Sequence, residues 1–171
     1  MVQHIVFGLE DAFRTARPDL TDPIARALWA DKELDAGRGS RLLAKAQNAT
    51  IVEDCLFYND GERYALAAWC IMPTHVHIVA ELFEAAALGA LVQQWKSFTA
   101  HAINKAEARK GALWQREYFD RFMRSEQQLE WTLRYVENNP VAAGLAQQPE
   151  DWRFSSARRK RSAGEDAGAP Y

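Results

Sequence analysis

The chain has 171 residues, of which 48% are hydrophobic, so it is long enough for one domain with its own core and too short for two domains of ordinary size. Its 21 Lys and Arg against 23 Asp and Glu give a net charge of -2, which excludes a protein that coats nucleic acid through overall positive charge. The two cysteines are not closely paired and no apolar run approaches membrane-spanning length, so we expect a reduced, soluble, cytoplasmic protein.

The first half of the chain predicts a strand, a helix and two more strands. Residues 2–9 form an apolar run with β-branched residues, which is typical of a strand. Residues 11–39 are charged and interrupted by two prolines, and they predict no firm element. Residues 40–58 carry apolar side chains at helical spacing before an Asn-Asp-Gly turn. Residues 64–72 and 75–82 then predict two adjacent strands.

The second half predicts a long helix, a short strand and a last helix. Residues 85–109 are rich in Ala and Leu and end before a glycine, as a helix does. Residues 117–123 indicate a short aromatic strand. Ser125 and Gln128 fit a helix-capping box, and we expect the last helix to end near residue 138 because of Pro140.

This order predicts an α+β fold: a ferredoxin-like antiparallel sheet (βαββαβ) with helices on one face, and an additional C-terminal helix that carries Tyr135. The other face of the sheet is then free for a site or for the extra helix. We expect one domain over residues 1–157, with the chain past Gly144 wrapping back as a loop. Residues 158–171 read as a basic, disordered tail.

Two histidines give the sharpest chemical signal. His75 and His77 are separated by one residue on a predicted strand, so both imidazoles point to the same face while Val76 points into the core. They can therefore converge on one metal ion. A His-x-His pair is a weak signal by itself, because surface or core histidines show the same spacing.

The last helix offers a second polar pair. Leu129, Leu133 and Val136 form its core stripe, and Tyr135 and Asn139 lie one turn apart on a neighbouring face. A phenol and an amide therefore share a side of the helix that the core does not need. The same pattern fits an amphipathic rim residue followed by a helix terminator, and the residues alone leave both interpretations open.

Four ordered segments carry a family resemblance: 69–77 (WCIMPTHVH), 95–99 (WKSFT), 114–121 (WQREYFDR) and 135–145 (YVENNPVAAGL). Together they resemble the REP-associated tyrosine transposases, which are HUH single-tyrosine transposases. Segments 34–43 (LDAGRGSRLL) and 149–157 (PEDWRFSSA) are similar to one branch of that family. The resemblance covers residues 5–157.

The resemblance implies a metal-dependent single-strand DNA endonuclease and strand transferase that acts on hairpin-containing, REP-like DNA. It makes His75 and His77 the histidine pair that binds Mg²⁺ or Mn²⁺, and Asn139 the polar third ligand. It makes Tyr135 the nucleophile that becomes linked to a 5′-phosphate. It also implies the same ferredoxin-like fold.

Several further residues are candidates for DNA contact. Unpaired bases could stack on Trp95, Trp114 or Tyr118, although core packing is favoured for both tryptophans. Two other histidines, His4 and His101, are expected to be surface or packing residues. The residues expected to contact phosphate are Lys96, Arg116, Arg121, Arg158, Arg159, Lys160 and Arg161.

Other classes of function remain open at this point. The chain could be a domesticated, non-catalytic nucleic-acid-binding module of the same fold, in which the histidines are structural. It could also be a metal hydrolase unrelated to DNA. A monomer and a homodimer are both compatible with the sequence, since some HUH transposases supply the tyrosine from a partner subunit.

Overall fold

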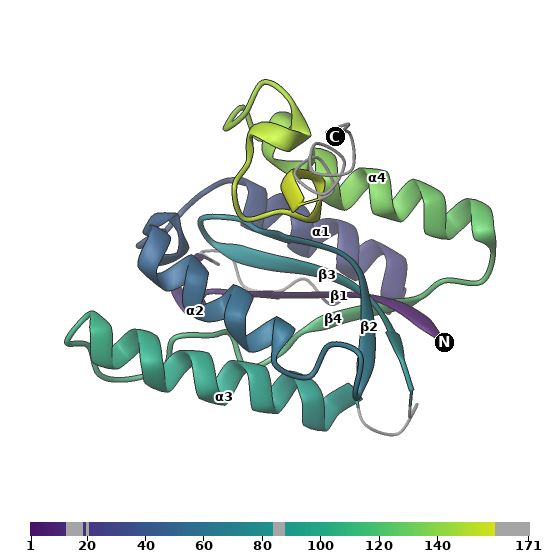
Figure 1. Cartoon of the computed structure of the whole chain (residues 1–171). Coiled ribbons are helices and arrows are strands. Elements are labelled where there is room, and N and C mark those ends of the chain that lie inside the picture. The colour runs from purple at the N-terminus through teal and green to yellow at the C-terminus, as the bar shows by residue number, and fades with distance from the viewer. Residues whose placement is uncertain (13–18, 20, 84–87, 160–171) are drawn as a thin grey trace, which may run out of the picture.

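The structure, a computed structural model of the chain, describes residues 1–12, 19, 21–83 and 88–159. The described residues form four strands and four α-helices, with short 3-10 helices between some of them (Figure 1). In chain order they are β1 (Val2–Gly8), α1 (Pro23–Asp35), α2 (Ala46–Phe57), β2 (Tyr64–Ile71), β3 (His75–Leu82), α3 (Leu88–Ala106), β4 (Phe119–Phe122) and α4 (Glu126–Ala142). Within this part of the chain, no helix combines the length and the apolar character that crossing a membrane requires.

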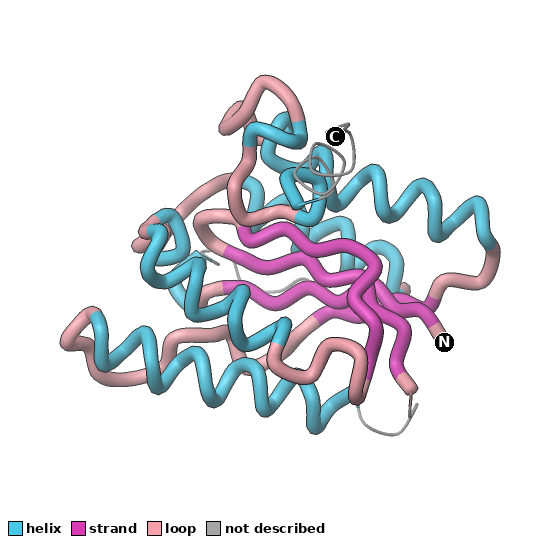
Figure 2. The backbone as a smooth tube through the Cα atoms, viewed as in Figure 1, coloured by secondary structure: helices cyan, strands magenta, loops and turns pink. Residues whose placement is uncertain are grey.

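The four strands form one antiparallel sheet in the order β2-β3-β1-β4 (Figure 2). The connection from β1 to β2 contains α1 and then α2, and α3 connects β3 to β4, so each connection returns the chain to the sheet. This is the βαββαβ arrangement of a ferredoxin-like fold, and the predicted fold class is confirmed.

The sheet is covered on both faces. One face packs against α2 and α3 in a large apolar cluster that includes Phe7, Ile78 and Trp95. The other face packs against α4 in a smaller cluster built around Val79 and Val136. Side chains alternate along each strand, so residues in odd and even positions of β3 belong to different faces. Figure 1 shows α1 and α4 on the same side of the sheet.

Helix α1 is the element that the sequence did not predict. Pro23 stands at its first position, where a proline is favoured because the first amide of a helix needs no partner. Asp22 caps the helix by accepting a hydrogen bond from the amide of Ala25 at 3.2 Å. The second face of the sheet is therefore shared by two helices.

Helix α4 runs past Pro140 to Ala142, so the prediction that this proline ends the helix is wrong. Pro140 removes only one amide donor near the end of the helix, and the amide of Ala143 still bonds to the carbonyl of Asn139 at 3.0 Å. Gly144, with φ of 70°, ends the helix instead. At the other end, Ser125 accepts from the amide of Gln128 at 3.1 Å, as its sequence predicted.

The chain after α4 returns to the edge of the sheet. The amide of Ile71 on β2 donates to the carbonyl of Phe154 at 2.9 Å, and Phe154 is buried in the larger cluster. The predicted return of the chain is confirmed. Most of the predicted tail, residues 160–171, lies outside the described residues, as does the predicted start of α3 at residues 85–87, and the domain boundary at residue 157 stays a prediction.

Candidate active site

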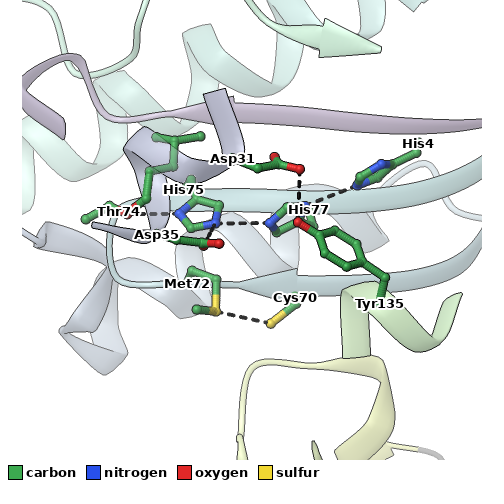
Figure 3. A network of polar contacts seen from close by, with 10 residues as sticks. His4, Asp31, Asp35, Cys70, Met72, Thr74, His75, His77 and Tyr135 are labelled. Atoms are coloured by element: carbon green, nitrogen blue, oxygen red, sulfur yellow. Dashed lines mark hydrogen bonds and ion pairs between the residues drawn. The ribbon is translucent and has the colours of Figure 1, made fainter. Parts of the chain in front are cut away.

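Strand β3 brings the predicted histidine pair together on the face that α4 covers. The Nε2 atoms of His75 and His77 lie 3.0 Å apart, and both side chains are fully buried (Figure 3). Burial lowers the pKa of His77 to about 3 and that of His75 well below its usual value. Both rings are therefore neutral at physiological pH, the state in which an imidazole nitrogen can bind a metal ion.

A chain of hydrogen bonds fixes the orientation of His75. Its Nδ1 lies 2.9 Å from the hydroxyl of Thr74, and that hydroxyl donates to the carbonyl of Leu34 at 3.0 Å. Because the hydroxyl proton is committed to Leu34, the threonine oxygen accepts from Nδ1–H of His75. This assignment leaves a lone pair on Nε2, which faces His77. Such an outer partner is typical of histidines that hold metal ions.

His4 supports the other ring. Its Nε2 lies 3.1 Å from Nδ1 of His77, and the two rings stack with centroids 5.3 Å apart. His4 is thus a packing residue, as expected, but one that packs on a residue of the candidate site. No local signal could reveal this contact, because it depends on the pairing of β1 with β3, in which His4 lies opposite Val79.

Tyr135 projects from α4 toward the histidine pair of the same chain. Its ring meets that of His77 edge to face, with centroids 5.8 Å apart, and its hydroxyl donates to Asp31 at 2.9 Å. Burial strongly raises the pKa of Tyr135, and the charges of Asp31 and Asp35 raise it further, so the free protein holds a protonated phenol. One chain thus supplies the phenol and both imidazoles.

Two acidic residues of α1 complete this side of the site. Asp31 contacts Tyr135, and Oδ1 of Asp35 lies 3.5 Å from Nε2 of His75. Burial raises the pKa of each carboxyl group to about 6, and the charge of Asp31 adds to the effect at Asp35. The sequence did not single out Asp31 or Asp35 as site residues, although two aspartates four residues apart on a helix lie on the same face.

Asn139, one turn after Tyr135, is also buried. Its amide forms a hydrogen bond that lowers the pKa of Tyr135, while its Oδ1 has no hydrogen-bond partner among the described residues. A buried carbonyl oxygen without a partner is costly unless a ligand satisfies it.

The two imidazole nitrogens are suitable ligands for a divalent metal ion. Two neutral nitrogens 3.0 Å apart have the separation of about 3 Å expected for adjacent ligands of an octahedral ion with bonds of about 2.1 Å. Within the described part of the chain, no group of three or more His, Cys, Asp or Glu side chains is arranged to hold an ion. That the oxygen of Asn139 supplies a third ligand stays a prediction.

An open cavity of about 500 Å³ lies beside the phenol. Tyr135 and Trp131 both line it, and their rings stack with centroids 5.3 Å apart and an angle of 8°. Trp131 is 58% exposed, which is unusual for so large an apolar side chain. The site thus has an aromatic surface next to its phenol that the sequence analysis did not single out.

The predicted DNA-contact residues are dispersed. Arg121 lies opposite His4 in the sheet, close enough for its charge to lower the pKa of His4. The guanidinium of Arg159 instead lies 4.5 Å from the centre of the Phe57 ring, on the face covered by α2. Arg116 is exposed, and Arg158 donates to the carbonyl of Glu150. Tyr118 packs partly against the larger cluster, in which Trp95 and Trp114 are core residues. Lys160 and Arg161 lie outside the described residues.

Lys96 has a structural role in the free protein. Its side chain is 9% exposed, and its ammonium donates to the carbonyls of three consecutive residues, 115–117. These bonds hold the loop that leads into β4 and carries Arg116 and Tyr118. A phosphate contact by Lys96 stays a prediction, and it would compete with these three bonds.

Replacing Lys96 with methionine is expected to lower the free energy of unfolding by about 2–4 kcal/mol, because three carbonyls lose a charged donor. Urea denaturation would measure the change. Lys105→Met on the exposed side of the same helix is the matched control and should change stability by less than about 0.5 kcal/mol. Equal stability of Lys96→Met and the unmodified protein would contradict this structural role.

Comparisons with known proteins assign the chain to a family. The family model described as "Transposase IS200 like" matches residues 43–139, more than half of the chain. A Haemophilus influenzae protein described as a REP-associated tyrosine transposase is 28% identical over 106 residues, which cover 56% of this chain and 60% of that protein. The match thus spans less than two thirds of this relative.

One solved structure shares the fold. The structure of a REP-associated tyrosine transposase bound to a REP hairpin superposes with a TM-score of 0.59 at 18% identity, over 95% of this chain and 80% of that one. A transposase structure from Deinococcus radiodurans gives a TM-score of 0.43 at 19% identity, over 81% and 90% of the two chains. The resemblance to REP-associated tyrosine transposases is confirmed, and the chain belongs to the IS200-like transposase family.

Proposed function

We propose that this protein nicks and rejoins single-stranded DNA, with Tyr135 as the nucleophile. The observation that carries the proposal is the position of the Tyr135 ring, which meets the buried, neutral His77 ring edge to face in a chain of the IS200-like family. A phenol beside two metal-binding nitrogens suits attack on an anionic phosphodiester.

Each residue of the site has its own role in the proposed reaction. His75, His77 and Asn139 would hold Mg²⁺ or Mn²⁺, which when bound neutralises charge on a phosphate oxygen. The oxygen of Tyr135 attacks phosphorus, and the bond from phosphorus to the 3′-oxygen breaks. The 5′-phosphate remains on Tyr135 and the other strand keeps a free 3′-hydroxyl. A second 3′-hydroxyl can reverse the step, because the phosphotyrosine conserves the energy of the original link.

The proposed substrate is single-stranded DNA that contains a hairpin. A similar solved structure is described as bound to a REP hairpin, which supports this class of substrate. Trp131 offers an exposed ring beside Tyr135 on which an unpaired base can stack. Arg121 adds positive charge at the β4 edge of the same face.

Incubation with end-labelled, hairpin-containing single strands and Mn²⁺ tests the proposal. We expect a covalent protein–DNA species that survives denaturing electrophoresis and disappears when a chelator is added. Binding without this species would favour the non-catalytic module. Cleaved DNA without this species would favour a metal hydrolase that uses water.

A further inference from the structure

The partner of Tyr135 on α1 has no role in the chemistry described so far. The hydroxyl of Tyr135 donates to Oδ2 of Asp31 at 2.9 Å, and these two residues are 104 positions apart in the chain. Figure 3 shows Asp31 and Tyr135 reaching toward each other from two different helices. A half-buried carboxylate that contacts the proposed nucleophile needs an explanation, because burying a charge is costly.

We propose that Asp31 is a catalytic residue that takes the proton of Tyr135 during attack. This inference rests on the proposed function. As the phenol oxygen bonds to phosphorus, its O–H bond breaks and the proton moves to Oδ2 of Asp31. The bond between phosphorus and the 3′-oxygen breaks, and the released oxygen takes a proton from water. In the joining reaction the 3′-hydroxyl loses a proton to water, and Asp31 returns its proton to Tyr135.

The chemistry of the site favours Asp31 for this task. A protonated phenol is a weak nucleophile, and a base must lie within hydrogen-bond distance of its proton to assist attack. The other group that hydrogen-bonds to Tyr135 is the amide of Asn139, which cannot accept a proton at neutral pH. Burial raises the pKa of Asp31 to about 6, so it is ionised near pH 7 and more basic than an exposed aspartate.

The fold holds Asp31 in place by bonds outside the pair. The hydroxyl of Thr74, next to His75, donates to the carbonyl of Leu34 on α1 at 3.0 Å. This bond ties α1 to the start of β3 within one helical turn of Asp31. This contact therefore fixes the carboxylate relative to the histidine pair, and the hydrogen bond from Tyr135 then joins the phenol to them.

Asp31→Asn separates proton acceptance from packing. Asparagine keeps an oxygen that can accept the hydrogen bond of Tyr135, but it cannot take the proton. We expect the single-turnover rate of covalent adduct formation to fall by about 10²–10⁴-fold. Affinity for the DNA hairpin should stay within about threefold, and Asp31→Glu should recover part of the rate. Glu33→Gln is the matched control on the same helix, where Glu33 pairs with Arg38, and it should keep the normal rate.

A more acidic nucleophile provides the decisive readout. With a fluorinated tyrosine at position 135, the Asp31→Asn protein should gain at least about tenfold in rate, whereas the protein with Asp31 should change by less than about threefold. A purely structural role for Asp31 predicts no such rescue. If Asp31→Asn does not fold, Asp31→Ser replaces it with the same expectations.

The outcomes separate this inference from the proposed function. An adduct in the unmodified protein together with an unchanged rate in Asp31→Asn, or a reduced rate that fluorotyrosine does not rescue, overturns the role of Asp31 alone. No adduct in the unmodified protein overturns the proposed function and the role of Asp31 with it.

Discussion

Replacing Tyr135 with phenylalanine is expected to lower covalent adduct formation by at least about 10³-fold while hairpin affinity stays within about twofold. The change removes one oxygen and leaves the ring that packs against His77 and Trp131. The fold should therefore persist, because Val136 and the rest of the smaller cluster keep their packing. Only the proposed nucleophile and its hydrogen bonds to Asp31 and Asn139 are lost.

Denaturing electrophoresis of the labelled DNA measures adduct formation, and a gel-shift titration measures affinity. Tyr58→Phe is the matched control, since Tyr58 is 80% exposed and lies at the end of α2. It should form the adduct at the normal rate. An adduct that persists in Tyr135→Phe would assign the nucleophile to another residue.

Replacing His77 with alanine is expected to reduce Mn²⁺ affinity by at least about 100-fold and to reduce cleavage with it, since loss of a supporting residue around a metal ligand already costs about 10–100-fold. His77 is completely buried between His75 and His4. Its removal takes away one proposed ligand and the contact that His4 makes with the site.

Calorimetric or EPR titration with Mn²⁺ measures this loss without depending on catalysis. His101→Ala is the control, because His101 is exposed on α3 and should leave the affinity unchanged. Thermal unfolding of both variants identifies any general loss of structure. Equal Mn²⁺ affinity in a folded His77→Ala protein would remove the histidine pair from the metal site.

Much of the architecture could be predicted from local pattern. The strand period of two places His75 and His77 on one face, and the helical period places Tyr135 and Asn139 on one side of α4. The short distance between the Nε2 atoms of the two histidines agrees with that inference. Helix α1 escaped prediction because Pro23 was treated as a breaker, whereas at the first position of a helix it favours the helix.

Charge alone was a poor guide to the DNA-contact residues. Lys96 is surrounded by backbone carbonyls, and Arg159 stacks on Phe57, so two predicted phosphate contacts have partners within the protein. A basic residue in a sequence carries no information on the groups that surround it after folding. Burial and hydrogen bonding decide which cations remain available to phosphate.

The four strands, the three α-helices other than α1, the paired imidazoles and the face shared by the phenol and the amide follow from local spacing, because the backbone period decides which way each side chain points. The carboxylate that meets the phenol is 104 residues away from it, and the third imidazole is 73 residues from the one it contacts. Such contacts arise from strand register and helix docking, which depend on the packing of the whole core. Only the folded chain could therefore bring Asp31 to Tyr135 and His4 to His77.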